Sequence, residues 1–445
     1  MTQLLNYTFM GSATIPLGTV LRMKEGFVRC KSPDYIVGYI NQPNTITMLG
    51  NFEDGEAQGS IRPSTMLRIH ATLDPIATAP TKSPPDFPRN ECREVLSRVQ
   101  QFSERYLEGT NCSVLWPDIH GVGYLTSRFL TAQNPPKIRA MTLEACAHYV
   151  SLIPSKRTWS SLKRLNMSQH LVLTSTQTLD ILAGDAAEHA VLLANYFMYL
   201  GKKNPAEYNA HVCLVLGCSI PEGNTVWVMR KSSSGDVLLW DATSGCAFSR
   251  EDDSIPLQKV YCLVSKENIY ANLHQETKPH SLDFDLTNPK KWAPLHNTDD
   301  QVPLDITTIQ EETLTYSPPN HSYARELQDE LKETIKSAMR EWRRTTTSFR
   351  TDTVPKLVSI LERLEQAKLG SKDVVVPLEV LSKTRNVSGF ALHFAYTNTD
   401  DVLRSVKATE IHENRNPHVE FSLGIRVFAY PGGALSVWIF LSTMT

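Results

Sequence analysis

The chain has 445 residues, of which 41% are hydrophobic and 21% are charged, and its formal net charge is -2. This composition is typical of a globular protein with ample chain for a packed core. At about 150 residues per domain, the length predicts roughly three domains. The near-zero charge gives no global electrostatic reason to bind nucleic acid or an acidic membrane, so we expect no nucleic-acid partner.

The cysteines and the first residues of the chain indicate in which cellular compartment the protein is expected. The eight cysteines are scattered and form no CxxC pair, which favours reduced, buried thiols in an intracellular protein. Met1–Leu4 does not begin a basic segment followed by an apolar core, so no signal peptide is predicted. No apolar run approaches the roughly 20 residues that a membrane-spanning helix needs. We therefore expect a cytoplasmic protein.

Residues 1–75 have the pattern of β-strands. Thr65–Leu73 alternates between apolar and polar positions, as a half-buried strand does. The stretch Met10–Leu17 resembles the late-strand signature of C2 domains, which implies a partial C2-like β-sandwich whose front strands are missing. The loop around Glu53 and Asp54 lacks the spaced aspartates of a calcium-binding C2 domain. The expected role is structural or protein-binding, with membrane proximity as an open option.

Residues 76–89 are rich in proline and predict a stiff linker that marks the first domain boundary. The next domain is predicted to span residues 90–300. Helices are expected at Asn90–Tyr106 and Thr142–Leu152, the second ending before a proline.

The centre of this domain is a sharp turn, Gly184–Ala190, that opens a buried helix running to Leu200 with Gly201 as its C-cap. Strands are predicted after it, at Val212–Leu216, Thr225–Met229 and Val237–Asp241. A helix that presents its N-terminus to a following sheet resembles papain-like and transglutaminase-like folds. In those folds a cysteine at the helix start is activated by the helix dipole, and a histidine and an aspartate from later strands complete a triad.

The triad positions can be assigned by this resemblance. The nucleophile motif Gly-x-Cys laid on Gly184 places the cysteine position at Ala186. The histidine position, before an aromatic residue in a strand, falls on Thr225, and the acid is retained as Asp241. Alanine has no lone pair with which to attack, and threonine cannot act as a base near neutral pH. We therefore predict an inactive, pseudoenzyme domain.

Other residues of the chain are candidates to replace the missing groups. Asp185 and His189 lie one helical turn apart and could clamp a metal, but without a second histidine cluster a packed histidine is the simpler interpretation. The remaining candidate thiols are Cys146, Cys213, Cys218 and Cys246. His211 and Cys213 share a strand face at spacing i, i+2 and form the best surviving Cys/His pair. A core or loop role is nevertheless favoured for these thiols.

The last third of the chain predicts a compact α+β unit at residues 321–445, after a polar, proline-bearing boundary at residues 296–320. A strand is expected at Ser281–Leu286 before that boundary. Amphipathic helices are expected at Tyr323–Arg344 and Val354–Leu369. The final hairpin has strands at Val419–Val427 and Leu435–Leu441, joined by a Pro-Gly-Gly turn, and its free edge is a candidate docking strip for a partner strand.

Four arginines gather near the end of the first of these helices: Arg340, Arg343, Arg344 and Arg350. They could form a patch for phosphate or anionic lipid. Cations at a helix C-terminus also complement the helix dipole, and this second interpretation is favoured.

A closer family resemblance emerges when the flanks of the central helix are included. The segments Gly184–Leu193, Tyr199–Lys203, Leu214–Gly217, Ile220–Gly223, Asn416–Phe421 and Leu435–Ile439 together resemble the C-terminal half of the coiled-coil and C2 domain-containing protein 2A family. The family implies a non-catalytic scaffold at the ciliary transition zone, alongside B9-domain and tectonic proteins, in contact with the cytoskeleton at the cilium base. The chain departs from the family by lacking its long N-terminal coiled-coil region and much of its C2 domain.

The sequence thus predicts an α+β protein with a partial C2-like β-sandwich, an inactive papain/transglutaminase-like domain and a C-terminal α+β unit. No cofactor and no metal site is predicted. The expected function is protein–protein scaffolding that supports cilium assembly. The alternative is a cysteine hydrolase or transglutaminase that uses a displaced thiol, and a third interpretation is a membrane-targeting C2 protein.

Overall fold

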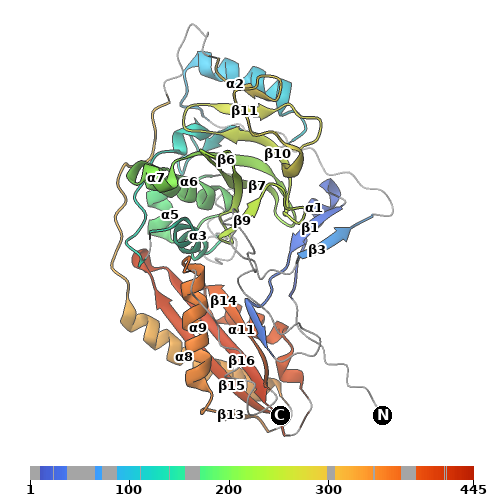
Figure 1. Cartoon of the computed structure of the whole chain (residues 1–445), viewed down its shortest axis with the longest axis vertical. Helices are drawn as coiled ribbons and strands as arrows, with labels where there is room; N and C mark the ends of the chain where they lie inside the picture. Colours follow the sequence, from blue (N-terminus) through green and yellow to red (C-terminus); the bar gives the residue numbers. More distant parts are fainter. Residues whose placement is uncertain are drawn as a thin grey trace.

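The structure is a computed structural model that describes residues 11–23, 25–37, 66–72, 88–110, 112–139, 141–155, 171–297, 306–343, 346–371, 387–414, 416 and 418–444. Two bodies are stacked along the long axis of the molecule, each built on its own β-sheet (Figure 1). The Glu53–Asp54 loop, most of the 76–89 linker and Arg344 lie outside the described residues.

The upper body holds a seven-stranded sheet in which every neighbouring pair is antiparallel. Its order is β12 (Trp292–Pro294), β11 (Ile269–Asn272), β10 (Leu257–Val264), β6 (Ala210–Ser219), β7 (Gly223–Ser232), β8 (Val237–Asp241) and β9 (Cys246–Ser249). The central strand β6 is buried at eight consecutive positions, because both faces of the sheet are covered. A near-continuous apolar run is what such a strand requires.

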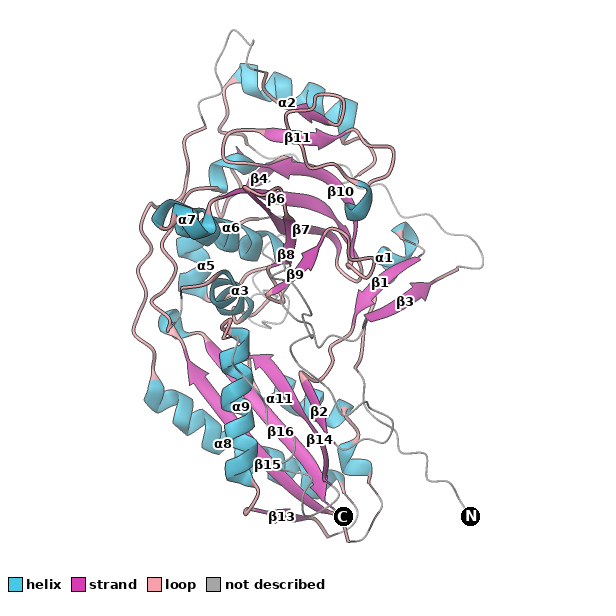
Figure 2. Ribbon diagram, in the orientation of Figure 1, coloured by secondary structure: helices cyan, strands magenta, loops and turns pink. Residues whose placement is uncertain are grey.

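Helices cover one face of this sheet (Figure 2). They are α2 (Arg93–Tyr106), α3 (Leu143–Ser151), α5 (Ser175–Ile181) and α6 (Ala186–Lys203), followed by the short α7 (Pro205–Tyr208). A hairpin of β4 (Leu115–Pro117) and β5 (Gly123–Leu125), with the 3-10 turn Thr126–Phe129, packs into the same core. The opposite face is covered by a loop that contains the 3-10 turn Pro279–Ser281. Leu282 and Phe284 of this loop are buried together with Trp292 of β12.

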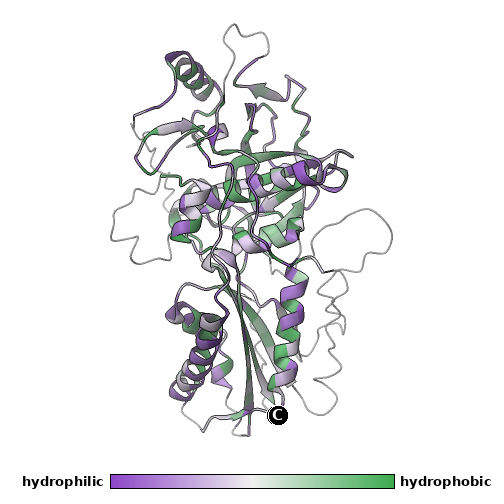
Figure 3. Cartoon of the chain, turned by 90° about the vertical axis from the view of Figure 1, so that its left-hand side faces the viewer, coloured by the Kyte–Doolittle hydropathy of each residue, from purple (hydrophilic) through white to green (hydrophobic). Residues whose placement is uncertain are grey.

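The lower body is a three-layer α/β/α unit. Its sheet has the order β13 (Ser348–Arg350), β15 (Glu420–Ala429), β16 (Leu435–Met444), β14 (Val387–Ala395) and β2 (Tyr35–Val37). Helices α8 (His321–Trp342) and α11 (Thr399–Ala408) pack on one face, and α9 (Val354–Lys368) packs on the other. The strands are mostly apolar and run between helices on both sides (Figure 3). The predicted hairpin and its covering helices are confirmed.

The N-terminal segment does not form a domain of its own. Helix α1 (Leu17–Arg22) and the two-stranded ribbon of β1 (Glu25–Arg29) and β3 (Met66–His70) lie beside the upper body, whereas β2 joins the lower sheet (Figure 1). Val28 of the ribbon packs against Cys218 and Ile220 at the β6–β7 turn. A two-stranded ribbon is marginal alone, so the predicted C2-like sandwich is not found in the described residues.

Two local predictions were wrong for reasons of tertiary packing. Gly201 does not end α6, which continues to Lys203; a Cβ there would lie 3.1 Å from the Tyr208 carbonyl oxygen, so glycine allows α7 to approach. Ser281–Leu286 is a 3-10 turn and a loop whose apolar residues dock on the sheet face. Within the predicted boundary at residues 296–320, Leu314 is buried and packs on the core of the upper body.

Among the described residues, no helix combines the length and apolar character needed to cross a bilayer.

The close approach of α9 to β15 depends on Gly424, where a Cβ would lie 2.7 Å from the Leu357 Cβ. We expect Gly424→Ala to lower the free energy of unfolding by about 1–3 kcal/mol, as overpacking does in tight interiors. The measurement is the urea midpoint at unchanged slope. The control is Gly18→Ala in α1, where a Cβ meets nothing within 4 Å; an equal loss in both variants would contradict the packing account.

Candidate functional site

Ala186 is the first residue of α6, where the resemblance places a nucleophile. The preceding turn is held by a bridge between Ser155 and Gly184, and the Gly184 amide donates to the Pro154 carbonyl at 3.0 Å. Asp185 and Glu188 form a reciprocal capping box, in which the Asp185 amide donates to the Glu188 carboxylate at 2.9 Å. A capping box satisfies the helix start internally. The turn and helix were therefore predicted correctly, and this end of α6 is already occupied by the chain's own groups.

His189 is fully engaged by the backbone. Its side chain is buried, and its Nδ1 and Nε2 lie 2.8 Å from the Asp185 carbonyl oxygen and 2.9 Å from the Ile153 carbonyl oxygen. Neither ring nitrogen faces a space that could hold a ligand. This geometry supports the interpretation of His189 as a packed histidine over that of a metal clamp with Asp185.

Thr225 and Asp241 lie on the face of the sheet that α6 does not cover. In β7, Val228 packs in the α6 core, whereas Trp227 and Met229 pack in the core on the opposite face. Side chains alternate along a strand, so Thr225 shares the face of Trp227. The register pairs Val228 with Trp240, which places Asp241 on that face as well. The structure therefore does not bring Thr225 and Asp241 toward Ala186.

The positions that do face α6 carry no general base. On β7 the residue next to Thr225 is Val226, and on β8 the residue next to Asp241 is Trp240; both pack in the α6 core. Trp240 lies against Phe197 of α6, with ring centroids 5.2 Å apart. An apolar side chain cannot accept a proton from a nucleophile, so a one-residue shift of the assignment restores no triad.

Asp241 organises the β8–β9 turn instead. Its carboxylate accepts hydrogen bonds from the Thr243 and Ser244 hydroxyls, both at 2.6 Å, and lies 3.9 Å from Arg29 of β1. An aspartate that bonds the backbone and side chains two or three residues on is a turn former.

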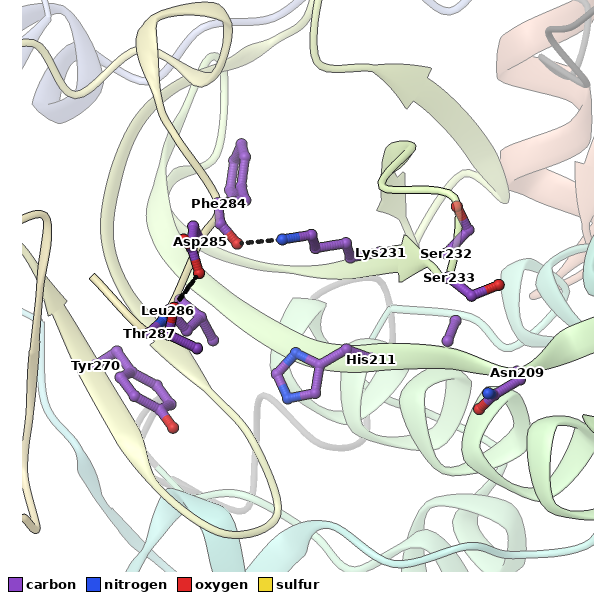
Figure 4. Close-up of a pocket in the computed structure, with 11 residues that line it drawn as sticks. Asn209, His211, Lys231, Ser232, Ser233, Tyr270, Phe284, Asp285, Leu286 and Thr287 are labelled. Carbon is purple, nitrogen blue, oxygen red and sulfur yellow. Dashed lines mark hydrogen bonds between the residues drawn. The ribbon is translucent and has the colours of Figure 1, made fainter. Parts of the chain in front are cut away.

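The Cys213–His211 pair is present, with the thiol sulfur 3.5 Å from Nδ1 of His211. Cys213 has no solvent exposure, and burial raises the pKa of its thiol. Partial desolvation of the ring also lowers the pKa of His211, although the residue as a whole is exposed. His211 points into a cavity of about 420 Å³ that is also lined by Lys231, Tyr270 and Asp285 (Figure 4). The thiol stays protonated, so the pair lacks the thiolate that attack requires.

The other candidate thiols are also embedded in the fold. Cys146 and Cys218 are buried, and burial raises the pKa of the Cys146 thiol. Cys246 is half-buried on β9.

The four-arginine patch is not a single free surface. Arg343 is buried, lies over the Phe421 ring and donates to the carbonyls of His412 and Asn414. Arg350 pairs with Asp352 at 2.8 Å and Glu420 at 3.1 Å. These contacts favour a structural role.

The junction between the two bodies holds a cluster that the sequence did not predict. Glu365 of α9 is buried, and its Oε1 lies 3.1 Å from Nε2 of His148 on α3. The Tyr430 hydroxyl donates to the same oxygen, and the Ser436 hydroxyl and Trp438 indole donate to Oε2. Four side chains from three segments therefore satisfy one carboxylate.

The electrostatics of this cluster favour a charged carboxylate. Burial alone would raise the pKa of Glu365, but the attraction of His148 and the hydrogen bonds from His148 and Tyr430 outweigh it, so the pKa of this carboxyl lies well below its usual range. His393 of β14 stacks on Trp438 with ring centroids 4.5 Å apart. Burial lowers the pKa of His393 to about 3, so its ring is neutral at physiological pH.

Two further ion pairs tie the N-terminal segment across the junction. Asp34, just before β2, lies 2.7 Å from Nζ of Lys368 at the end of α9. Arg29 lies near Asp241 of the upper sheet. Arg29, which contacts the upper body, and Asp34, which contacts the lower body, are separated by only four residues of the same segment.

Removing one donor from Glu365 is the first test of the junction. We expect Tyr430→Phe to lower the free energy of unfolding by about 1–3 kcal/mol, because a buried carboxylate loses a hydrogen bond. Tyr323→Phe on the exposed surface of α8 is the matched control, and it should be neutral. Equal urea midpoints for wild type and Tyr430→Phe would contradict the assigned contact.

The Asp34–Lys368 pair predicts a pH-dependent difference between variants. Burial raises the pKa of Asp34, but Lys368 outweighs this and the net shift is downward. A lowered pKa stabilises the fold above the ordinary value of about 3.9, and this contribution is lost as the pH falls through the folded value. The destabilisation caused by Lys368→Met should therefore be largest at pH 7 and shrink below about pH 4.

Lys336→Met is the control for this titration, because Lys336 pairs with the exposed Glu333, where an ion pair contributes little. Urea unfolding from pH 7 to pH 3 measures both. If the loss of unfolding free energy caused by Lys368→Met did not change with pH, the ion pair could not be its cause.

Comparisons with known proteins agree with this architecture. Residues 170–295 match the model of the CEP76 peptidase-like domain, and residues 316–445 match that of the centrosomal protein of 76 kDa C-terminal domain. Human protein CC2D2B is 27% identical over 98% of this chain and 30% of its own length. The Drosophila melanogaster coiled-coil and C2 domain-containing protein 2A is 26% identical over 98% of this chain and 33% of its own length.

A third relative, the mouse centrosomal protein of 76 kDa, is 22% identical over 58% of this chain and 42% of its own length. The chain spans about a third of the length of the first two relatives. Their similarity runs through the peptidase-like upper body and the C-terminal body alike. Along nearly its whole length, the chain is therefore similar to the coiled-coil and C2 domain-containing protein 2A family.

Proposed function

We propose that the chain is a non-catalytic scaffold of the ciliary transition zone that supports cilium assembly through protein–protein interactions. The observation that carries this proposal is Ala186 at the start of α6, where the resemblance places the nucleophile. The strand residues Val226 and Trp240, which lie on the α6 side of the sheet, cannot act as a base. A helix start and a sheet face built this way lack the groups for covalent catalysis. The family relationship supplies the cellular setting.

The proposed partners follow from the same relationship: B9-domain and tectonic-like proteins at the cilium base. The two bodies and the N-terminal segment are joined by buried polar contacts at Glu365 and Asp34. A rigid junction suits a scaffold, because partners bound to different bodies then keep a fixed spacing.

The alternative function, a hydrolase with a displaced thiol, rests on the Cys213–His211 contact at 3.5 Å beside the cavity. Full burial of Cys213 and the raised pKa of its thiol weigh against it. It predicts one hyper-reactive cysteine and an activity that Cys213→Ser removes.

Tagging the protein at its own locus in a ciliated cell tests the proposal. We expect signal at the cilium base and fewer cilia after deletion. Diffuse cytosolic signal together with normal cilia after deletion would discard the scaffold role.

Restoring a thiol at position 186 tests the effect of the missing nucleophile separately from that of the missing base. In Ala186→Cys the helix dipole should lower the thiol pKa, so we expect faster iodoacetamide labelling than in wild type. We expect no peptidase or transglutaminase turnover, because in the described part of the chain Val226 and Trp240 occupy the strand positions on the α6 side and neither can act as a base. Turnover by Ala186→Cys, or by wild type in a manner lost in Cys213→Ser, would contradict the pseudoenzyme assignment.

A further inference from the structure

Three side chains that commonly bind metals converge at the junction of the two bodies. They are His148 of α3, Glu365 of α9 and His393 of β14, and their candidate ligand atoms all lie within 4.8 Å of one another. His148 and Glu365 are buried and His393 is half-buried. We propose that this cluster binds a divalent metal ion of the zinc class, which would fasten α3 to the C-terminal body.

The spacing of the first two ligands fits one ion. Nε2 of His148 and Oε1 of Glu365 are 3.1 Å apart. Two ligands that each lie about 2.0 Å from a tetrahedral zinc ion are separated by about 3.3 Å. The ion would take the place of the proton between these two atoms, with only a small widening of the contact.

The remaining hydrogen bonds of Glu365 are compatible with a bound ion. A carboxylate oxygen has two lone pairs. Oε1 can therefore bind the ion and still accept from Tyr430, while both lone pairs of Oε2 accept from Ser436 and Trp438. Donors that orient a ligating carboxylate are the usual outer layer of a metal site.

Ser436 also sets the orientation of the third ligand. Nε2 of His393 lies 2.9 Å from the Ser436 Oγ. Because the Ser436 hydrogen is directed to Glu365, its oxygen accepts from the His393 Nε2–H. This tautomer, assigned from the hydrogen-bond network, leaves a lone pair on the Nδ1 of His393.

The protonation state of His393 and its access to solvent also suit metal binding. Burial lowers the pKa of His393 to about 3, and a neutral imidazole is the form that ligates. Two histidines and one carboxylate form a typical zinc donor set. The cluster offers three ligands among the described residues, and solvent reaching the half-buried His393 can supply a fourth.

The test uses the full chain purified without chelators. Metal content by inductively coupled plasma mass spectrometry should give about one zinc per chain, and X-ray absorption should show nitrogen and oxygen ligands at about 2.0 Å with imidazole scattering. His393→Gln should lose the metal. Ser436→Ala, which removes a positioning residue, should weaken zinc binding about 10–100-fold in a competition titration.

His280→Gln, an exposed histidine in the 3-10 turn of the upper body, is the control and should keep the metal. The X-ray absorption measurement needs no variant, so it decides the matter even if a variant fails to fold. A wild-type chain that holds no metal and binds added zinc no more tightly than His393→Gln would overturn the proposal. Binding that is equal in all variants would do the same, because it would mark an adventitious ion.

Discussion

The fold depends on how the charge of Glu365 is satisfied in the protein interior. An unpaired buried carboxylate is very costly, so its donors must all be present at once. These donors come from α3, from the hairpin turn and from β16. Since α3 also packs against α6, this one carboxylate links the peptidase-like body to the C-terminal sheet.

The N-terminal segment reinforces the same junction from the other side. Arg29 reaches the β8–β9 turn, and Asp34 pairs with the last turn of α9, three residues beyond Glu365. Strand β2 completes the lower sheet by pairing with β14. The N-terminal segment, which the sequence pattern predicted to be a separate domain, therefore connects the two bodies.

Local patterns predicted the elements well, and tertiary contacts account for what they missed. The helices at α6, α8 and α9 and the final hairpin were predicted, because their periodicity and turn residues are encoded in adjacent residues. The faces of β7 and β8 could not be predicted, because the face occupied by Thr225 depends on which side α6 packs. The Glu365 cluster was also missed: His148 and Glu365 are 217 residues apart, and no spacing rule links them. The one available signal was Glu365 itself, which occupies a position in the apolar stripe of α9.

The account's central claim is that this chain acts by holding partners and not by thiol chemistry. The most direct measurement is rescue of cilia in cells lacking the protein, using a variant in which Cys146, Cys213, Cys218 and Cys246 are each replaced by alanine. The account predicts full rescue by this variant at normal protein levels. Failure to rescue by a variant that is folded and present at the wild-type level would contradict it.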